Sequence, residues 1–432
     1  MAPSLRYGAI LLMALPATLT YISTPLAGVI DTYVIAQLNK AHLIGGLALG
    51  GVLFDLVFVS FNFLRAVTTG LVAQTRRDSD ALLILLRACF VAIVLGVVVV
   101  LVREPVASYG SVLLGAEGEV QTALLAYFTV RCLSAPLMLT NYAMLGFLLG
   151  KRQTGSALLI QAVQNLCNIG LSIWFVIGNG WAVAGVAWAT VIAELVAVSL
   201  GFVVIGRRIS HPIDWSKLMV KAQWRQLFSM NFNMWVRTMC LVAAFAYFAN
   251  RSASLGPVIL AANAILEKLI SLSAYFLDGV ATVTEQLVGH AVGRQSKRRI
   301  RLAIINTLKV GFVIAAGLSA FWWLSADWTV LRMTDSPAIV DALTDALWWF
   351  TWVPIFGLAA YILDGAFIGA AWGRPMRTAM IQSLLFFLAI AWGFTEWFGN
   401  AGLWAALLLF FVIRALALSW QLRIKLQADS QR

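Results

Sequence analysis

Charged side chains are scarce in this sequence. Only 12% of its 432 residues are Asp, Glu, Lys or Arg, whereas soluble domains carry about 25%. Hydrophobic residues make up 61% of the chain, so it cannot cover a folded surface with polar groups that face water. No polar stretch is long enough to build a separate soluble domain. These shortages exclude a soluble globular protein and favour an integral membrane protein.

Motifs that carry enzymatic chemistry are also lacking. The four cysteines stand singly inside apolar runs without a C-x-x-C pair, and the three histidines have no ligand spacing. There is no G-x-x-x-x-G-K-[ST] phosphate loop and no nucleophile elbow. We therefore expect no enzyme, no metal, no cofactor and no direct use of ATP. The net charge of +12 does not indicate nucleic acid, because the basic residues lie in short loops between apolar spans.

Long apolar runs dominate the chain instead. A membrane helix needs about 20 apolar residues, and breaks at polar, Gly or Pro positions predict twelve such spans. The first run is much longer than the apolar core of a signal peptide, which indicates a retained span. The predicted spans cover residues 8–38, 43–75, 80–102, 119–150, 153–178, 181–206, 224–250, 257–293, 299–324, 340–372, 375–397 and 400–423.

Successive loops between these spans lie on alternating sides of the membrane, and the basic residues gather on one of the two sides. The loops and termini on one side hold 20 Lys or Arg residues, and the loops on the other side hold 4. Cytoplasmic loops of membrane proteins carry the excess of positive charge. The pattern predicts an even number of spans with both termini in the cytoplasm.

Two short motifs recur at nearly one offset. Gly146-x-x-x-Gly150 in the fourth span matches Gly365-x-x-x-Gly369 in the tenth, 219 residues later. The sequence AGVAWA at 184–189 matches AGLWAA at 401–406, 217 residues later. Small residues four apart are common where membrane helices pack closely, but the shared offset indicates a duplicated six-helix unit. Because each repeat has six spans, an even number, the second repeat enters the membrane from the same side as the first. The two repeats are therefore parallel.

We therefore predict an all-α integral membrane protein with twelve transmembrane helices in two six-helix bundles related by pseudo-two-fold symmetry. The N-terminal half covers residues 1–206, a cytoplasmic linker covers 207–223, and the C-terminal half covers 224–432. Two bundles that face each other leave a central cleft, and rocking of the bundles gives alternating access.

The first span carries one carboxylate, Asp31, together with Pro16 and Pro25. A charged residue at the centre of a membrane helix costs roughly 2.5–3.5 kcal/mol on insertion scales, and proline removes a backbone hydrogen bond. We predict that Asp31 takes up and releases a proton, and that its charge decides whether this helix is straight or bent. The alternative is a protonated Asp31 that only hydrogen-bonds neighbouring helices together.

Polar residues on later spans are candidate partners of Asp31. Asn165 and Asn168 lie three residues apart on one helix face, and Thr190 lies on the next span. Amides and hydroxyls can hydrogen-bond either protonation state of a carboxyl. Glu194 follows Thr190 by one turn, and we expect it to partner an arginine.

The C-terminal half carries a second set of acids within its spans. Because intramembrane arginines rarely remain unpaired, the alternative to an ion or substrate site is charge pairing with Arg65, Arg131 or Arg237. The candidate residues are Asp278, Glu285, Tyr361 and Asp364.

Several motifs follow the order and spacing of one transporter family. The chain resembles MATE-type multidrug exporters, and specifically their DinF-like branch, over nearly its whole length. The resemblance rests on TPLAGVIDT at 24–32, FLRAVTTGLVAQ at 63–74, Asn165-x-x-Asn168, AWATVIAE at 187–194 and Tyr361-x-x-Asp364.

The resemblance implies export of amphipathic, often cationic compounds in exchange for protons or sodium. It implies an N-lobe cavity around Asp31, with Pro16 as the proline that bends on protonation. Asn165, Asn168 and Thr190 match cavity residues. Ser172 stands where some relatives carry a second acid, and this departure favours protons over sodium. In other branches an acid in the tenth span belongs to a sodium site, a position that Asp364 matches.

The predicted function is multidrug efflux coupled to protonation of Asp31, in a bacterial inner membrane. The expected partners are small amphipathic substrates, protons or sodium, and membrane lipids, and the protein is expected to be a monomer. A flippase for lipid-linked precursors is the alternative from another class, and it requires a large, strongly basic cleft.

Overall fold

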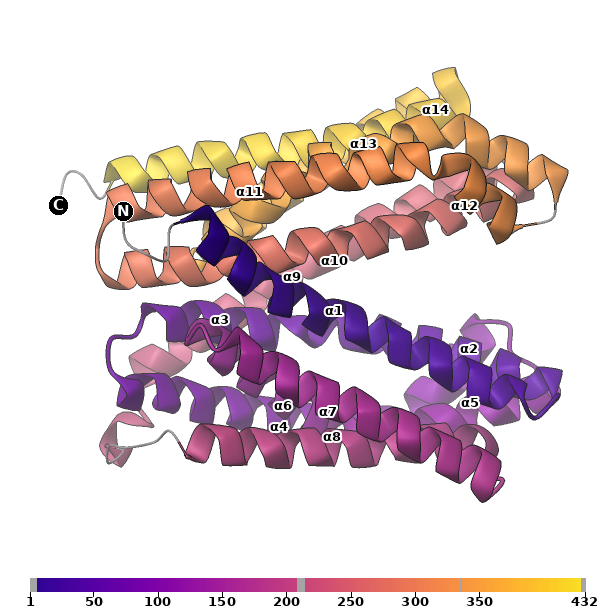
Figure 1. The fold of residues 1–432 in the computed structure, drawn as a ribbon, viewed down its shortest axis with the longest axis horizontal. Helices are drawn as coiled ribbons and strands as arrows, with labels where there is room; N and C mark the ends of the chain where they lie inside the picture. Colours follow the sequence, from indigo (N-terminus) through magenta and orange to yellow (C-terminus); the bar gives the residue numbers. More distant parts are fainter. Residues whose placement is uncertain (1–5, 208–213, 335, 429–432) are drawn as a thin grey trace. The chain divides into compact units, whose positions relative to one another are not determined.

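The computed structural model describes residues 6–207, 214–334 and 336–428. This part of the chain is helical almost throughout (Figure 1). Eleven of the helical segments within it are long and apolar enough to cross a membrane. The predicted all-α membrane fold is therefore confirmed.

The helices follow one another with short connections. They are α1 (Tyr7–Ala36), α2 (Ala41–Phe58), α3 (Phe63–Gln74), α4 (Asp78–Leu113), α5 (Gly118–Arg131), α6 (Ala135–Gly150), α7 (Thr154–Ile173), α8 (Ala182–Gly206), α9 (Lys221–Ser254), α10 (Pro257–Gly293), α11 (Lys297–Leu324), α12 (Ala326–Met333), α13 (Pro337–Gly369) and α14 (Gly373–Ala428). The 3₁₀ turn Val59–Asn62 joins α2 to α3, and Cys132–Ser134 joins α5 to α6, so each of these pairs forms one span.

Two predicted boundaries differ from the structure. The span predicted to end at residue 102 continues to Leu113, because α4 accommodates Pro105 within the helix. The last two predicted spans lie in the single element α14, where Gly399 has a non-helical φ of 58° and ψ of −135°. A positive φ suits glycine, which has no β-carbon. Gly399 therefore separates two helices within α14, and this break accounts for the predicted twelfth span.

The chain forms two compact units. The N-terminal unit contains residues 19–228, and the C-terminal unit contains residues 1–18 and 229–432. One division falls within α1 between Thr18 and Leu19, two residues after Pro16. The division of the membrane spans into two six-helix halves, 1–206 and 224–432, stays a prediction.

Each unit has its own apolar core. In the N-terminal unit, α6 packs against α3, α4 and α8, and α7 packs along α8. In the C-terminal unit, α13 packs against α10, α11 and α14. The fully buried Trp404 of α14 lies edge-on to Phe248 of α9, with ring centroids 5.2 Å apart.

Glycines of α6 bring two backbones together in the N-terminal unit. A β-carbon on Gly146 would lie 2.5 Å from the carbonyl oxygen of Arg65, and one on Gly150 would lie 2.8 Å from that of Thr69. These separations are shorter than van der Waals contact, so α6 and α3 can approach this closely only because both positions lack a side chain.

The matching glycines of α13 have the same role in the C-terminal unit. A β-carbon on Gly365 would clash with the carbonyl oxygen of Ala281, and one on Gly369 would clash with that of Glu285. The two carbonyls lie four residues apart on α10, as Arg65 and Thr69 do on α3. The repeated motif thus makes the same kind of helix contact in both units.

Candidate functional site

Asp31 is hydrogen-bonded within the N-terminal unit. Its Oδ1 accepts a 2.7 Å hydrogen bond from the hydroxyl of Ser172 on α7. Asp31 is half-buried and Ser172 is fully buried. Ser172, which stands where some MATE-type proteins carry an acid, is therefore the direct hydrogen-bond partner of Asp31.

Asn168 lies one turn before Ser172 and reaches the next helix. Its Nδ2 donates a 2.9 Å hydrogen bond to Oγ1 of Thr190 on α8. The Thr190 hydroxyl in turn donates to the backbone carbonyl of Val186 at 3.0 Å. Since residues four apart share a helix face, Ser172 and Asn168 point from the same side of α7.

A third polar residue of α7 lies one turn before Asn168. The amide of Gln164 and that of Asn141 on α6 lie within hydrogen-bonding reach of the Glu194 carboxyl. Asn141 Nδ2 also donates to Gln164 Oε1 at 2.9 Å. Glu194 is buried and lies one turn after Thr190 on α8. Polar side chains on three successive turns of α7 therefore hydrogen-bond to Asp31, Thr190 and Glu194.

We call this arrangement the polar ladder. It consists of Ser172 with Asp31, Asn168 with Thr190, and Gln164 with Glu194. Asn165 lies beside the ladder, where its Oδ1 accepts a 3.3 Å hydrogen bond from Gln161 Nε2. The structure thus brings Ser172 to Asp31 and Asn168 to Thr190, while Asn165 belongs to the amides around Gln164.

Arg131 of α5 is a cation that acts electrostatically on this ladder. It interacts electrostatically with both Asp31 and Glu194. Its Nη1 donates a 2.9 Å hydrogen bond to Ser134 Oγ, and its guanidinium lies over the ring of Phe54 at 4.3 Å from the centroid. Within the part of the chain that the structure describes, it forms no ion pair with a carboxylate.

Asp364 of α13 is engaged by two arginines in the C-terminal unit. Its Oδ2 pairs with Arg237 of α9 and with Arg414 of α14. Asp364 and Arg414 are both buried. Tyr361 and Asp278 interact electrostatically with both arginines. The charge pairing that the sequence offered as an alternative for Asp364 is present, and Arg414 is a second partner.

The other predicted residues lie at separate places. Glu285 of α10 is buried, and its backbone carbonyl lies against Gly369 of α13. Pro16 lies inside α1, which continues as a helix through it. Arg65 of α3 donates to the hydroxyl of Tyr21 at 2.5 Å.

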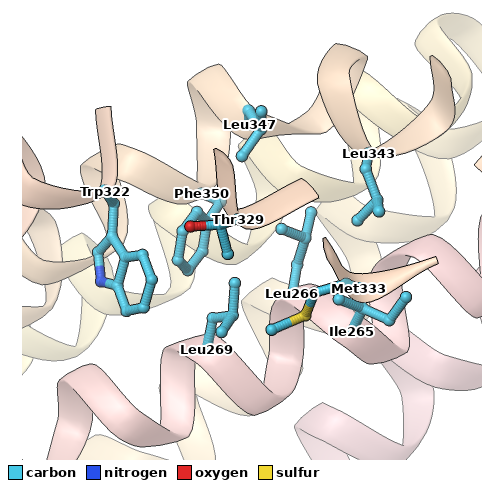
Figure 2. A pocket seen from close by; sticks show the side chains of 9 residues that line it. All are labelled: Ile265, Leu266, Leu269, Trp322, Thr329, Met333, Leu343, Leu347 and Phe350. Carbon is cyan, nitrogen blue, oxygen red and sulfur yellow. The ribbon is translucent and has the colours of Figure 1, made fainter. Parts of the chain in front are cut away.

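An apolar pocket lies in the C-terminal unit, and none of these residues lines it. Figure 2 shows its lining side chains converging from four helices. Thr329 of the short helix α12 contributes a hydroxyl to a lining that is otherwise hydrophobic. The lining residues are Ile265, Leu266, Leu269, Trp322, Thr329, Met333, Leu343, Leu347 and Phe350.

Metal ligands do not gather in this fold. Among residues 6–207, 214–334 and 336–428, no group of three or more His, Cys, Asp or Glu side chains could hold a metal ion.

Sequence reasoning missed four members of these clusters. Gln161 and Gln164 continue the helical spacing of Asn168 and Ser172 along α7, and that periodicity was a usable signal. Arg414 stands alone in the apolar run 407–418, which also marks it. Asn141 carries no comparable signal in the sequence.

A multi-pass helical protein with two compact units, each with ionisable side chains buried among its helices, has the architecture of a membrane transporter. Three comparisons support this class. The MatE family model matches residues 234–392. DNA damage-inducible protein F of Escherichia coli strain K12 is 31% identical over 414 residues, which cover 94% of this chain and 90% of that protein. The chain therefore belongs to the MATE family, whose members are membrane transporters and not enzymes.

A more distant relative and a solved structure agree with this assignment. Multidrug resistance protein NorM of Vibrio cholerae is 25% identical over 233 residues, covering 52% of this chain and 51% of that protein. The outward-facing structure of a multidrug resistance MATE family transporter of the MOP superfamily has a TM-score of 0.88 at 19% identity. It covers 99% of this chain and 97% of that chain, and at this identity the likeness shows the fold.

Proposed function

We propose that this chain exports amphipathic, often cationic compounds in exchange for protons, and that Asp31 binds the coupling proton. The observation that carries the proposal is the hydrogen bond between Ser172 and Asp31 inside the N-terminal unit. A hydroxyl can donate to the carboxylate or accept from the protonated acid. Asp31 can therefore keep this partner in both protonation states.

The helix that carries Asp31 supports a change of shape. Pro16 lacks the N–H that would bond to Leu12, so α1 is weakened there. The boundary between the two compact units falls two residues later, after Thr18. Loss of the Asp31 charge would favour bending at Pro16, and bending would shrink the cavity that holds the substrate. Proton and substrate must then compete, because a ligand shifts an equilibrium only by its different affinity for the two states.

The surroundings of Asp364 and of Asp31 favour protons over sodium as the coupling ion. Sodium needs several oxygen ligands that are free of other cations. Asp364 Oδ2 instead pairs with two guanidinium groups, Arg237 and Arg414. At Asp31, the hydrogen-bond partner is the neutral hydroxyl of Ser172, and Arg131 interacts with the carboxyl electrostatically. Neither environment favours a bound sodium ion.

Membrane location and orientation complete the proposal. The Escherichia coli relative is bacterial, and the basic loops follow the rule that positive charge stays inside. We infer a bacterial inner membrane protein with both termini in the cytoplasm, which works as a monomer among membrane lipids. Cysteine accessibility at the two termini in spheroplasts would check the orientation.

Transport from proteoliposomes tests the coupling. Purified protein is reconstituted with a fluorescent cationic dye, and efflux is measured under an imposed proton gradient and then under an imposed sodium gradient. The proton gradient should drive efflux, and Asp31→Asn should abolish it while the fold is retained. Asp341→Asn is the matched control, because this exposed aspartate of α13 undergoes the same chemical change.

Three results would contradict the proposal. Full proton-driven efflux by Asp31→Asn would remove Asp31 from the mechanism. Efflux driven by sodium alone would favour the sodium antiporter. Movement of a fluorescent lipid-linked precursor in place of the dye would favour the flippase.

A further inference from the structure

Glu194 on α8 is a second buried carboxyl in the N-terminal unit, and the coupling scheme built on Asp31 does not use it. It is 3% exposed and lies two rungs along the polar ladder from Asp31. Ser172 and Gln164 are eight residues apart on α7, and this spacing corresponds to about 12 Å along the helix axis.

The hydrogen bonds around Glu194 leave two buried oxygens without a partner. Within the described residues, neither Oε2 of Glu194 nor Oδ1 of Asn141 has a hydrogen-bond partner. The Asn141 amide lies next to the Glu194 carboxyl. A buried carboxylate oxygen without a hydrogen-bond partner is costly. A proton on Oε2 would remove the buried negative charge and so lower this cost.

The charges that face Glu194 come from few elements. Arg131 of α5 interacts with it electrostatically, and Tyr142 of α6 does so as well. Tyr142 also interacts with Arg65 of α3 and Asp55 of α2. Helix α7 presents amides to Glu194. Arg131 therefore faces Glu194 and Asp31 together, without an ion pair to either among the residues described.

We propose that Glu194 is a second proton-binding site of the N-terminal unit, which holds its proton on Oε2, and that Arg131 couples it to Asp31. When Glu194 releases its proton, Arg131 balances the new negative charge. When Asp31 is the ionised group, Arg131 balances that charge instead. Proton binding at either carboxyl thereby changes proton binding at the other. This inference extends the proposed proton coupling, but the protonation of Glu194 can be measured without transport.

Infrared spectroscopy of the purified protein tests the site directly. A protonated carboxyl has a C=O stretching band that an ionised carboxylate lacks. Spectra of Asp31→Asn and of the double variant Asp31→Asn with Glu194→Gln are compared across pH. We expect a carboxyl band in the single variant that the double variant lacks and that disappears as the pH rises. Glu104→Gln, at an exposed glutamate, is the matched control for the second substitution.

The coupling has its own expected shift. Two unit charges separated by about 12 Å, the spacing of their partners on α7, change each other's titration by roughly one pH unit at an effective dielectric constant of about 20. The pH at which the Glu194 band disappears should therefore be roughly one unit lower in Asp31→Asn than in the wild type, because the negative charge of Asp31 is then absent and Arg131 acts on Glu194 alone.

Each contrary result is decisive. Identical spectra of the single and double variants at every pH at which the protein is folded would show that Glu194 is always ionised, and would overturn the site. A Glu194 band that persists at all such pH values would show a permanently protonated structural residue. An unshifted midpoint would overturn the coupling between the two carboxyls. Loss of proton-driven efflux in Asp31→Asn, measured separately, belongs to the proposed function and does not depend on these outcomes.

Discussion

Ser172 of α7 donates a 2.7 Å hydrogen bond to Asp31 of α1, and it does so from the helix face that also carries Asn168. The position that holds a serine instead of an acid is thus the one that contacts the candidate coupling carboxyl. A neutral donor stabilises the ionised form without adding a second negative charge.

Ser172→Ala removes this donor and tests its part in coupling. The ionised Asp31 loses stabilisation, so the pH profile of proton-driven efflux should move to more alkaline values by up to about one pH unit. Efflux in proteoliposomes across a pH series measures the shift. Ser156→Ala, a serine in the first turn of the same helix, is the control. An unchanged profile would mean that the hydrogen bond does not affect proton binding at Asp31.

Asp364→Asn leaves two buried guanidinium groups without their shared carboxylate. Removing one partner of a buried ion pair typically costs about 3–5 kcal/mol. We expect a marked fall in melting temperature in detergent, measured by fluorescence of the purified protein. Adding Arg414→Gln should restore part of the loss, because one uncompensated charge then disappears. Wild-type stability of Asp364→Asn would indicate that the pairs contribute little.

Gly369→Ala should destabilise the C-terminal unit. The new β-carbon would clash with the backbone carbonyl of Glu285, and backbone cannot move aside cheaply. Overpacking of this kind costs about 1–3 kcal/mol. Gly317→Ala is the matched control, because nothing lies within 4 Å of its β-carbon position on α11. Alanine should stabilise that helix by up to about 1 kcal/mol. Equal melting temperatures of the two variants would contradict the close approach of α13 and α10.

Arg87→Ala should release the segment that precedes α9. The buried guanidinium donates to the carbonyls of Lys217 and Leu218, at 2.5 Å and 2.9 Å. Hydrogen bonds from charged groups contribute about 1.5–3 kcal/mol each, so local opening should rise at least about tenfold. Trypsin cleavage after Lys217, followed by mass spectrometry, measures this opening.

The control for that experiment is Arg77→Ala, which removes an exposed arginine at the start of the same helix. It should leave the cleavage rate unchanged. Equal cleavage of both variants would show that Arg87 does not restrain this segment.

Composition and spacing were sufficient to predict much of the fold. The membrane spans follow from apolar runs, since a lipid-facing helix must be hydrophobic along its whole length. The two glycine pairs, Gly146 with Gly150 and Gly365 with Gly369, marked close helix contacts that the structure contains. The end of α4 could not be predicted, because a proline inside a helix is tolerated or not according to its neighbours.

The sequence by itself determined that the chain is a membrane protein, which helix faces are polar, and that Asp31 is the single acid of its first span. Only the tertiary structure decided that Ser172 contacts Asp31, that Arg414 joins Arg237 at Asp364, and that Glu194 lies among amides. Helical periodicity fixes which side chains share one face of a helix. The partner on the next helix depends on how the two helices pack, and that packing is set by small residues at contacts distant in the sequence.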